Sequence, residues 1–340
     1  MTGPEVPTTA SERADNGSDV GIEVHLGPAD RRSMLEADVR AGLGGPVKAL
    51  PPMWFYDQRG SELFEEITEL PEYYLCRSES EILGRRADDV AVISGAEALV
   101  ELGSGASVKT QMLLDALQRQ GSLERFVGFD VSEAMLRDAS ARLRRRYPAL
   151  EVLGIVGDFH RHLASVPKDR RNLFAILGST LGNLAPEPRQ VMLSDLVGHM
   201  AEQDCLLLGL DLIKAPGRLV AAYDDSRGVT AQFNRNVLMV LNNELGADFE
   251  PEAFDHVAVW NEQHRWMEMR LRSRHPQVAD IPALDLKVFL EQGEEILTEI
   301  SCKFDPGHIA AEFARSGLGL VGQWMDDGRD FLVVLARPIN

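Results

Sequence analysis

The sequence predicts an α/β fold in which a mainly parallel sheet carries an inserted α+β piece. From about residue 77, short apolar runs alternate with helix-like segments, a pattern typical of parallel sheets. Between about residues 214 and 302 this rhythm stops, and a long amphipathic helix is followed by strand-like alternation. The strand and helix pattern then resumes, and the chain closes on two strand-like runs.

Five buried strands are expected in the alternating part. They are Ala98–Glu101, Phe126–Asp130, Val152–Val156, Leu173–Leu177 and Cys205–Leu210. Helices are expected between them, including Ser107–Gln120 and Ser132–Tyr147, the second with Ser132 as its N-cap. Four strands end in a glycine or polar turn, at Gly103, Asp130, Asp158 and Gly178. In open α/β sheets, ligands bind at such carboxyl ends of strands.

The inserted piece predicts a second structural unit. One apolar helix face ends at Gly246, and Met267, Met269 and Leu271 then alternate with charged residues as in a half-buried strand. We expect residues 31–76 and 214–302 to form a substrate-binding domain, and residues 77–213 and 303–340 to form the sheet domain. The closing pair Gly319–Trp324 and Phe331–Ala336 favours the methyltransferase variant of the Rossmann-like sheet over the nicotinamide type.

Composition excludes several classes of partner. The 340 residues carry a net charge of −18, which argues against nucleic acid or an anionic membrane as a ligand. No apolar stretch has the length of a membrane span, and three scattered cysteines indicate a reducing cytoplasm. The eight histidines show no metal-ligand spacing, so we expect no metal. Residues 1–30 lack apolar periodicity and are expected to be a disordered acidic tail, and the protein is expected to be a monomer.

The turn Glu101-Leu102-Gly103-Ser104-Gly105 indicates an adenosine-bearing cofactor. Glycines let a ligand approach bare backbone, and Asp130 at the tip of the next strand suits the two ribose hydroxyls. The dinucleotide fingerprint needs a third glycine where this chain has Val108, so a pyrophosphate is disfavoured. Glu101 beside the turn favours a cationic ligand such as the sulfonium of S-adenosylmethionine (SAM). A tight turn without a ligand is the alternative.

Three further segments carry polar groups toward the same region. Asp158-Phe159 could bind the adenine amino group and flank the base, although Asp158 could equally be a helix N-cap. The run from Gly178 to Asn183 combines two glycines with an amide that suits a small polar substrate, or it is a plain turn. Period-two alternation predicts Leu297, Glu299 and Ser301 on one strand face, able to hold a ring with two nitrogens; solvent-facing polar residues on an edge strand are the alternative.

Seven segments together resemble one enzyme family. They are Trp54-Phe55-Tyr56-Asp57, Leu70-Pro71-Glu72-Tyr73-Tyr74, Glu101-Leu102-Gly103-Ser104-Gly105, Gly178-Ser179-Thr180-Leu181-Gly182-Asn183, Ala222-Tyr223-Asp224-Asp225, Phe233-Asn234-Arg235-Asn236 and Leu297-Thr298-Glu299-Ile300-Ser301-Cys302-Lys303-Phe304. From about Met34 onward the chain is similar to the SAM-dependent L-histidine Nα-methyltransferases of the ergothioneine pathway. It departs from them at Leu75-Cys76, where proline and threonine are expected.

The resemblance implies the chemistry and the residues that carry it. Cofactor contacts would fall on Gly103, Lys109, Asp130, Asp158 and Phe159. Substrate contacts would fall on Tyr56, Tyr73, Gly178, Asn183, Tyr223, Met269, Glu299, Ile300 and Ser301. By this analogy Asn183 and Tyr223 hold the amino and carboxylate ends of L-histidine, whereas Tyr73, Glu299 and Ser301 hold its imidazole. The family methylates one nitrogen three times, giving hercynine, and no residue is identified as a general base.

Other functions stay open at this point. The same chemistry on another amino acid, such as tryptophan, is the nearest alternative, although paired Glu299 and Ser301 favour a ring with two nitrogens. A nucleoside-binding protein without turnover is a second alternative, and the polar substrate residues oppose it. A nicotinamide oxidoreductase is the third, opposed by Val108 and the closing hairpin.

Overall fold

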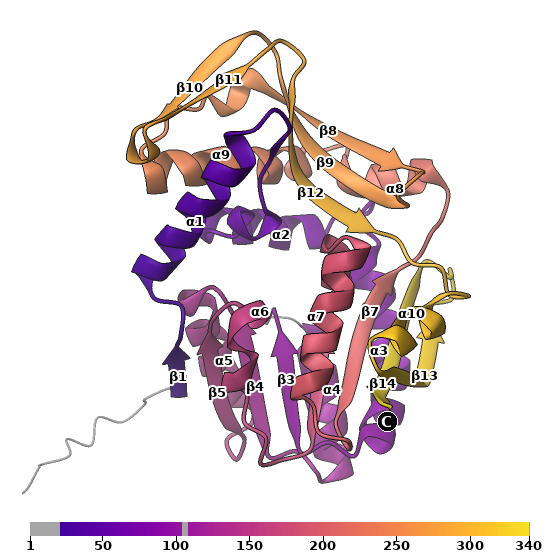
Figure 1. Ribbon diagram of the computed structural model, residues 1–340. Helices are drawn as coiled ribbons and strands as arrows, with labels where there is room; N and C mark the ends of the chain where they lie inside the picture. The colour runs from indigo at the N-terminus through magenta and orange to yellow at the C-terminus, as the bar shows by residue number, and fades with distance from the viewer. Residues whose placement is uncertain (1–20, 104–107, 340) are drawn as a thin grey trace, which may run out of the picture.

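An eight-stranded sheet forms the centre of the protein, whose computed structural model describes residues 21–103 and 108–339. Its strands are β1 (Gly21–Val24), β3 (Ala98–Leu102), β4 (Arg125–Asp130), β5 (Glu151–Val156), β6 (Asn172–Ile176), β7 (Cys205–Asp211), β13 (Leu318–Met325) and β14 (Phe331–Pro338). Their order is β1-β5-β4-β3-β6-β7-β14-β13, and only β14 runs antiparallel to the others (Figure 1). This sheet confirms the predicted Rossmann-like α/β class.

Helices cover both faces of this sheet because its strands are apolar on both sides. One face carries α3 (Leu75–Ser94), α4 (Val108–Gln120) and α5 (Glu133–Arg146); the other carries α6 (Phe159–His162), α7 (Pro186–His199) and α10 (Ile309–Arg315). The Ser132 side chain accepts a hydrogen bond from the Met135 N–H, which confirms the predicted N-cap of α5. The parallel strands therefore present their carboxyl ends to one edge of the sheet.

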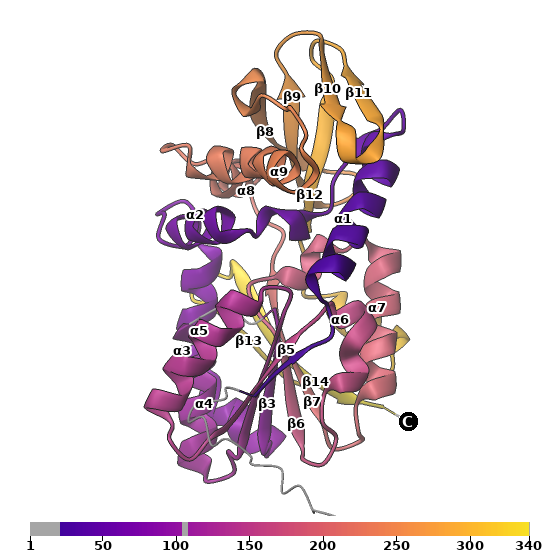
Figure 2. The ribbon, with the colours of Figure 1, turned by 90° about the vertical axis from the view of Figure 1, so that its left-hand side faces the viewer.

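A second, smaller assembly of helices and strands lies beyond that edge (Figures 1 and 2). Its helices are α1 (Pro28–Leu43), α2 (Gln58–Thr68), α8 (Pro216–Tyr223) and α9 (Val229–Leu245), with the short η1 (Pro52–Phe55), η4 (Pro251–Ala253) and η5 (Pro282–Leu284). Its four-stranded sheet has the order β2 (Lys48–Ala49), β12 (Glu295–Cys302), β9 (Trp266–Ser273) and β8 (Phe254–Asn261). A hairpin of β10 (Gln277–Ile281) and β11 (Leu286–Leu290) completes it.

The chain passes between the two assemblies beside the bridge between Leu212 and Phe304. One buried apolar cluster runs through both, from Leu99 on β3 to Phe233 on α9, so the predicted domain division stays a prediction. Helix α9 buries its predicted apolar face and ends at Gly246, as expected. None of the helices in the described part of the chain is long and apolar enough to span a membrane.

The N-terminal prediction is wrong for residues 21–30. Strand β1 pairs in parallel with β5, and α1 begins at Pro28, at a position where the fixed φ of proline suits a helix start. Backbone hydrogen bonds hold this edge strand, and the Ile22 side chain packs over Gly154. Disorder was predicted because these residues lack apolar periodicity, but a short, mostly exposed edge strand can form without such a pattern. Residues 1–20 of the predicted tail lie outside the described residues.

Candidate active site

The predicted cofactor residues lie at the carboxyl edge of β3, β4 and β5. Gly103 has φ +79°, donates its N–H to the Phe129 carbonyl at 2.8 Å, and is exposed, with no atom of another described residue within 4 Å of the place a Cβ would take. The described residues therefore do not crowd the backbone at Gly103. Residues 104–107 of the glycine turn lie outside the described residues. The Glu101 carboxylate is buried and accepts the Thr110 hydroxyl at 2.8 and 2.9 Å, which ties β3 to α4.

Asp130 forms the tip of β4, as the sequence predicts. One carboxylate oxygen accepts the Ser132 N–H at 2.9 Å, and burial raises its pKa although the backbone donors of Ser132 and Val131 oppose the rise. Asp158 follows β5 and is half-buried, and Phe159 begins α6 and packs against the core beneath it. The three side chains therefore border the same strand ends as Gly103.

Lys109, a predicted cofactor residue, is paired with a carboxylate that also holds the substrate-side turn at Gly178. Its ammonium lies 2.5 Å from the fully buried Glu79 carboxylate, which also accepts the Gly178 N–H at 2.9 and 3.0 Å. Burial opposes the charge on Lys109, but Glu79 holds its pKa above the ordinary value. The Lys109–Glu79 pair thus joins the start of α4 to the turn after β6.

Two glycines shape the turn after β6. Gly178 has φ +72° and uses its N–H on Glu79, so its carbonyl is the group left for a substrate. A Cβ on Gly182 would lie 2.9 Å from the Cys302 carbonyl, so glycine lets η3 (Thr180–Asn183) pack directly on β12. Asn183 ends η3 half-buried, and its side chain has no hydrogen-bond partner among the described residues. Its amide is therefore available to a ligand.

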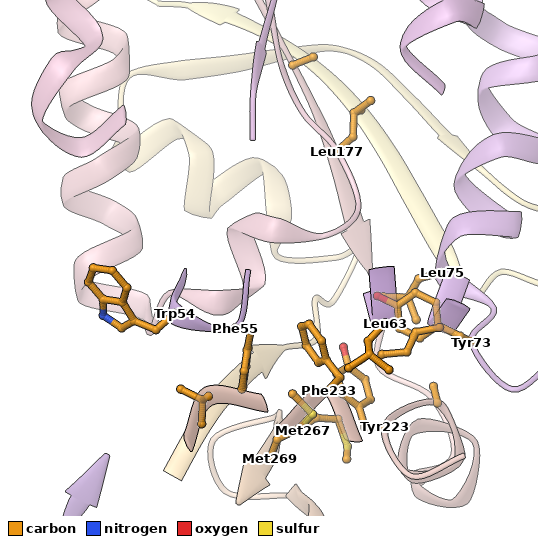
Figure 3. Close-up of a cluster of buried hydrophobic side chains, with 14 of the residues drawn as sticks. Trp54, Phe55, Leu63, Tyr73, Leu75, Leu177, Tyr223, Phe233, Met267 and Met269 are labelled. Atoms are coloured by element: carbon orange, nitrogen blue, oxygen red, sulfur yellow. The ribbon is translucent and has the colours of Figure 1, made fainter. Parts of the chain in front are cut away.

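Aromatic rings line the region between the two assemblies (Figure 3). Tyr56, Phe64, Tyr73 and Tyr223 form a chain of edge contacts with ring centroids 5.6, 6.2 and 6.5 Å apart, and Phe233 packs against Tyr56 and Phe64. Burial, followed by the Glu299 and Asp130 charges, raises the pKa of Tyr56, which stays a neutral phenol. Tyr56 thus lies near both the cofactor acid and the substrate acid.

Strand β12 corrects the predicted alternation. A β-bulge between Leu297 and Glu299 leaves Thr298 as the extra residue, so Leu297 lies opposite Arg270, whereas Glu299 and Ser301 lie opposite Met269 and Met267. Glu299 and Ser301 share a face as predicted, but Leu297 is on the other side. Ile300 lies opposite Glu268 on the face away from Glu299 and Ser301, so a contact with substrate would come from its backbone.

Glu299 is a half-buried carboxylate that makes no hydrogen bond to any described residue. Burial raises its pKa to about 7, and the nearby Lys303 charge offsets only part of the rise. Its charge in turn raises the pKa of Tyr73 and Tyr223, although burial is the larger cause. A carboxyl group left without a protein partner among aromatic rings is a feature typical of binding sites.

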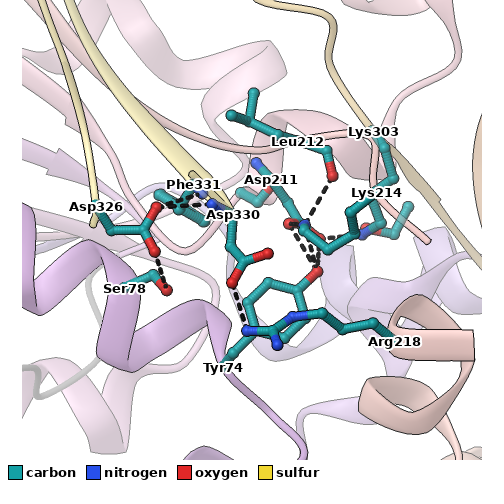
Figure 4. Close-up of polar contacts among 12 residues, drawn as sticks. Tyr74, Ser78, Asp211, Leu212, Lys214, Arg218, Lys303, Asp326, Asp330 and Phe331 are labelled. Carbon is teal, nitrogen blue, oxygen red and sulfur yellow. Dashed lines mark hydrogen bonds and ion pairs between the residues drawn. The ribbon is translucent and has the colours of Figure 1, made fainter. Parts of the chain in front are cut away.

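Sequence reasoning missed the buried charges beneath the substrate residues (Figure 4). The Asp211 carboxylate accepts the Tyr74 hydroxyl at 2.8 Å and pairs with Lys214 at 2.5 Å and Lys303 at 2.8 Å. Lys303 also donates to the Tyr223 hydroxyl at 2.7 Å and to Ser301 Oγ at 2.8 Å. An acid that ends the apolar strand β7 was the available signal for this cluster.

The fold and the site together define a class of protein. The sheet closed by an antiparallel hairpin, the positive-φ glycine that follows β3 and the acid at the tip of β4 are those of a Rossmann-like, SAM-dependent methyltransferase. The chain belongs to the family described as histidine-specific methyltransferase, SAM-dependent, whose model matches residues 35–338. This confirms the family resemblance found in the sequence.

Named relatives agree with the family. A histidine N-alpha-methyltransferase of Mycobacterium tuberculosis is 51% identical over 317 residues, covering 93% of this chain and 99% of the relative. One from Mycolicibacterium smegmatis is 51% identical over 302 residues, covering 89% and 94%. Ergothioneine biosynthesis protein 1 of Schizosaccharomyces pombe is 32% identical over 225 residues, covering 63% of this chain and 29% of that longer protein.

Proposed function

We propose that this protein transfers methyl groups from SAM to the α-amino nitrogen of L-histidine, three times, giving hercynine for ergothioneine biosynthesis. One observation carries the choice of substrate. Glu299, a half-buried carboxylate with no hydrogen-bond partner among the described residues, lies beside Ser301 and near Tyr56, Tyr73 and Tyr223. An imidazole has two ring nitrogens, one for the carboxylate and one for the hydroxyl.

The remaining substrate residues fit the amino-acid end. The free amide of Asn183 and the hydroxyl of Tyr223 would hold the amino and carboxylate groups, with the Gly178 carbonyl nearby. Met269, opposite Glu299 on β9, would pack against the ring, and the backbone of Ile300 would complete the wall. Each of these groups comes from a different element, so the bound amino acid would be held on several sides.

The residues at the carboxyl edge of the large sheet fit the cofactor. Asp130 would accept both ribose hydroxyls, Asp158 and Phe159 would hold the adenine, and Gly103 would let the ligand approach its backbone. Lys109 would contribute from its position against Glu79. When bound, SAM supplies a methyl group activated by a positively charged sulfur.

The protein would catalyse mainly by positioning the two reactants for in-line transfer. A neutral α-amino group is the nucleophile, and its proton would leave to water, because we assign no general base. The product becomes a fixed cation as methyl groups accumulate, and the rings of Tyr56 and Tyr73 would stabilise it. Neutral phenols suit this role, since burial raises the pKa of both tyrosines.

A direct assay tests the proposal. Purified protein incubated with SAM and L-histidine should yield mono-, di- and trimethylated histidine by mass spectrometry. L-tryptophan in a parallel reaction is the matched control and should stay unmethylated. Methyl transfer to tryptophan or another amino acid without transfer to histidine would overturn the substrate assignment. If no amino acid were methylated, the proposed methyltransferase activity itself would be contradicted.

A further inference from the structure

Lys303 is a fully buried cation whose three protons are all used within the protein. It lies 2.8 Å from Asp211 Oδ2 and donates to the Tyr223 hydroxyl at 2.7 Å and to Ser301 Oγ at 2.8 Å. An ammonium group has three N–H donors and no acceptor. Lys303 therefore has no donor left for a ligand and acts on ligands only through Tyr223 and Ser301.

Lys303 stays protonated at neutral pH although it is buried. Burial opposes the charge, but the Asp211 carboxylate and Tyr223 hold its pKa above the ordinary value. Lys214 shares the same carboxylate, yet burial together with the charge of Lys303 keeps the pKa of Lys214 below the ordinary value. Lys214 contacts Asp211, Tyr74 and the Leu212 carbonyl, and the hydroxyls of Tyr223 and Ser301 are not among its partners.

Both substrate hydroxyls accept from Lys303, and this fixes what they can do next. The two also bond to each other, with the Tyr223 hydroxyl 2.8 Å from Ser301 Oγ. Each hydroxyl has one proton, and the bond between them uses one of the two. The remaining O–H cannot be donated to Lys303, because an ammonium group has no acceptor. The pair must therefore present a donor to a ligand, beside the acceptor that Glu299 presents.

We infer that Lys303 is a positioning residue that leaves the Tyr223–Ser301 pair with one O–H to donate toward the substrate. The inference rests on the proposed function. It implies a substrate that offers one acceptor to this pair, a carboxylate oxygen or an unprotonated ring nitrogen, and an N–H toward Glu299. A neutral imidazole on a free amino acid has this pattern.

A double-mutant cycle on L-histidine binding tests the inference. By calorimetry, Lys303→Met should weaken L-histidine binding about 30-fold, through loss of charge-assisted hydrogen bonds, and leave S-adenosylhomocysteine binding within about threefold. In a Ser301→Ala/Tyr223→Phe background the same change should cost less than about threefold, because the groups it acts through are gone. Lys214→Met is the matched control and should retain L-histidine binding within about threefold.

Each result decides the question. An equal cost of Lys303→Met in both backgrounds, or equal loss of both ligands, would overturn the inference. Should Lys303→Met fail to fold, the variant Lys303→Met/Asp211→Asn/Lys214→Met removes all three buried charges together and takes its place in the same cycle. Failure of the parent protein to bind L-histidine would overturn the proposed function, whereas binding with an additive cycle would overturn only the role of Lys303.

Discussion

The cofactor side and the substrate side of this active site are built from contacts of very different range along the chain. Asp130 is held by Ser132, two residues away, and Glu101 by Thr110, nine residues away. On the substrate side, the Tyr74 hydroxyl bonds Asp211 across 137 residues, and Lys303 bonds Tyr223 across 80. A strand, turn and helix suffice for the first set, whereas the second exists only when the whole chain is assembled.

A second chain of hydrogen bonds holds the substrate side from the opposite end. The bulged Thr298 donates to Asn234 Oδ1 at 2.6 Å, and the Asn234 amide donates to His256 Nδ1 at 2.8 Å. His256 therefore carries its proton on Nε2 and donates to the Tyr223 carbonyl at 2.7 Å. Burial keeps the pKa of His256 below its ordinary value, which keeps the ring neutral so that Nδ1 can accept this hydrogen bond. The strand that carries Glu299 thus also fixes the backbone of Tyr223.

The comparison implies that substrate-side residues stabilise the fold as well as the ligand. Asp211→Ala would leave the buried ammonium groups of Lys303 and Lys214 without their carboxylate, and we expect it to lower the free energy of unfolding by about 3–5 kcal/mol. Urea denaturation measures this. The control is Asp327→Ala, which removes an exposed partner of Arg85 and should leave stability near that of the parent. Similar stabilities for the two variants would show that Asp211 is not a structural anchor.

Paired substitutions at the two acids should separate the two sites. Glu299→Ala should weaken L-histidine binding about 100-fold, because it removes a charged acceptor, and leave S-adenosylhomocysteine binding within about threefold. Asp130→Ala should do the reverse, weakening S-adenosylhomocysteine binding about 30-fold.

Calorimetry with each ligand alone measures both effects, and circular dichroism confirms that the variants fold. Loss of both ligands in either variant would contradict the division of the site into two halves.

The separation along the chain between contacting residues also explains which parts of the site the sequence could predict. Asp130 and Gly103 were identifiable because a strand tip and the turn beside it are local patterns. Glu299 and Ser301 were found by family resemblance and by alternation, but the bulge at Thr298 broke that alternation for Leu297.

The Asp211–Lys303 pair could not be predicted, because its members lie 92 positions apart by number and meet only where Leu212 bridges Phe304. Strand β1 was missed for a similar reason, since it depends on pairing with β5 rather than on its own apolar pattern. Long-range pairing leaves no period in the sequence to detect.

The smallest effect we expect is in the pH dependence of the unfolding free energy, to which two acids on β12, Glu299 and Glu295, contribute with opposite signs. Burial raises the pKa of Glu299 from 4.5 to about 7, so the stability it contributes is complete below pH 4.5 and is lost as pH rises through about 7. From pH 5 to pH 8, without ligand, the unfolding free energy of the parent should therefore fall relative to Glu299→Gln by about 2 kcal/mol, allowing for the half-buried position.

Glu295, four residues earlier on β12, is the matched control. Burial raises the pKa of its carboxyl, but the Arg270 and Arg272 guanidinium groups outweigh burial and hold that pKa below 4.5. Its contribution is present above pH 4.5 and lost only as pH falls, so the parent and Glu295→Gln should differ by a constant amount between pH 5 and pH 8. A constant difference for Glu299→Gln as well would mean that solvent or a buried partner already balances its charge. Glu299 would then not be the open acceptor that distinguishes the substrate side from the cofactor side.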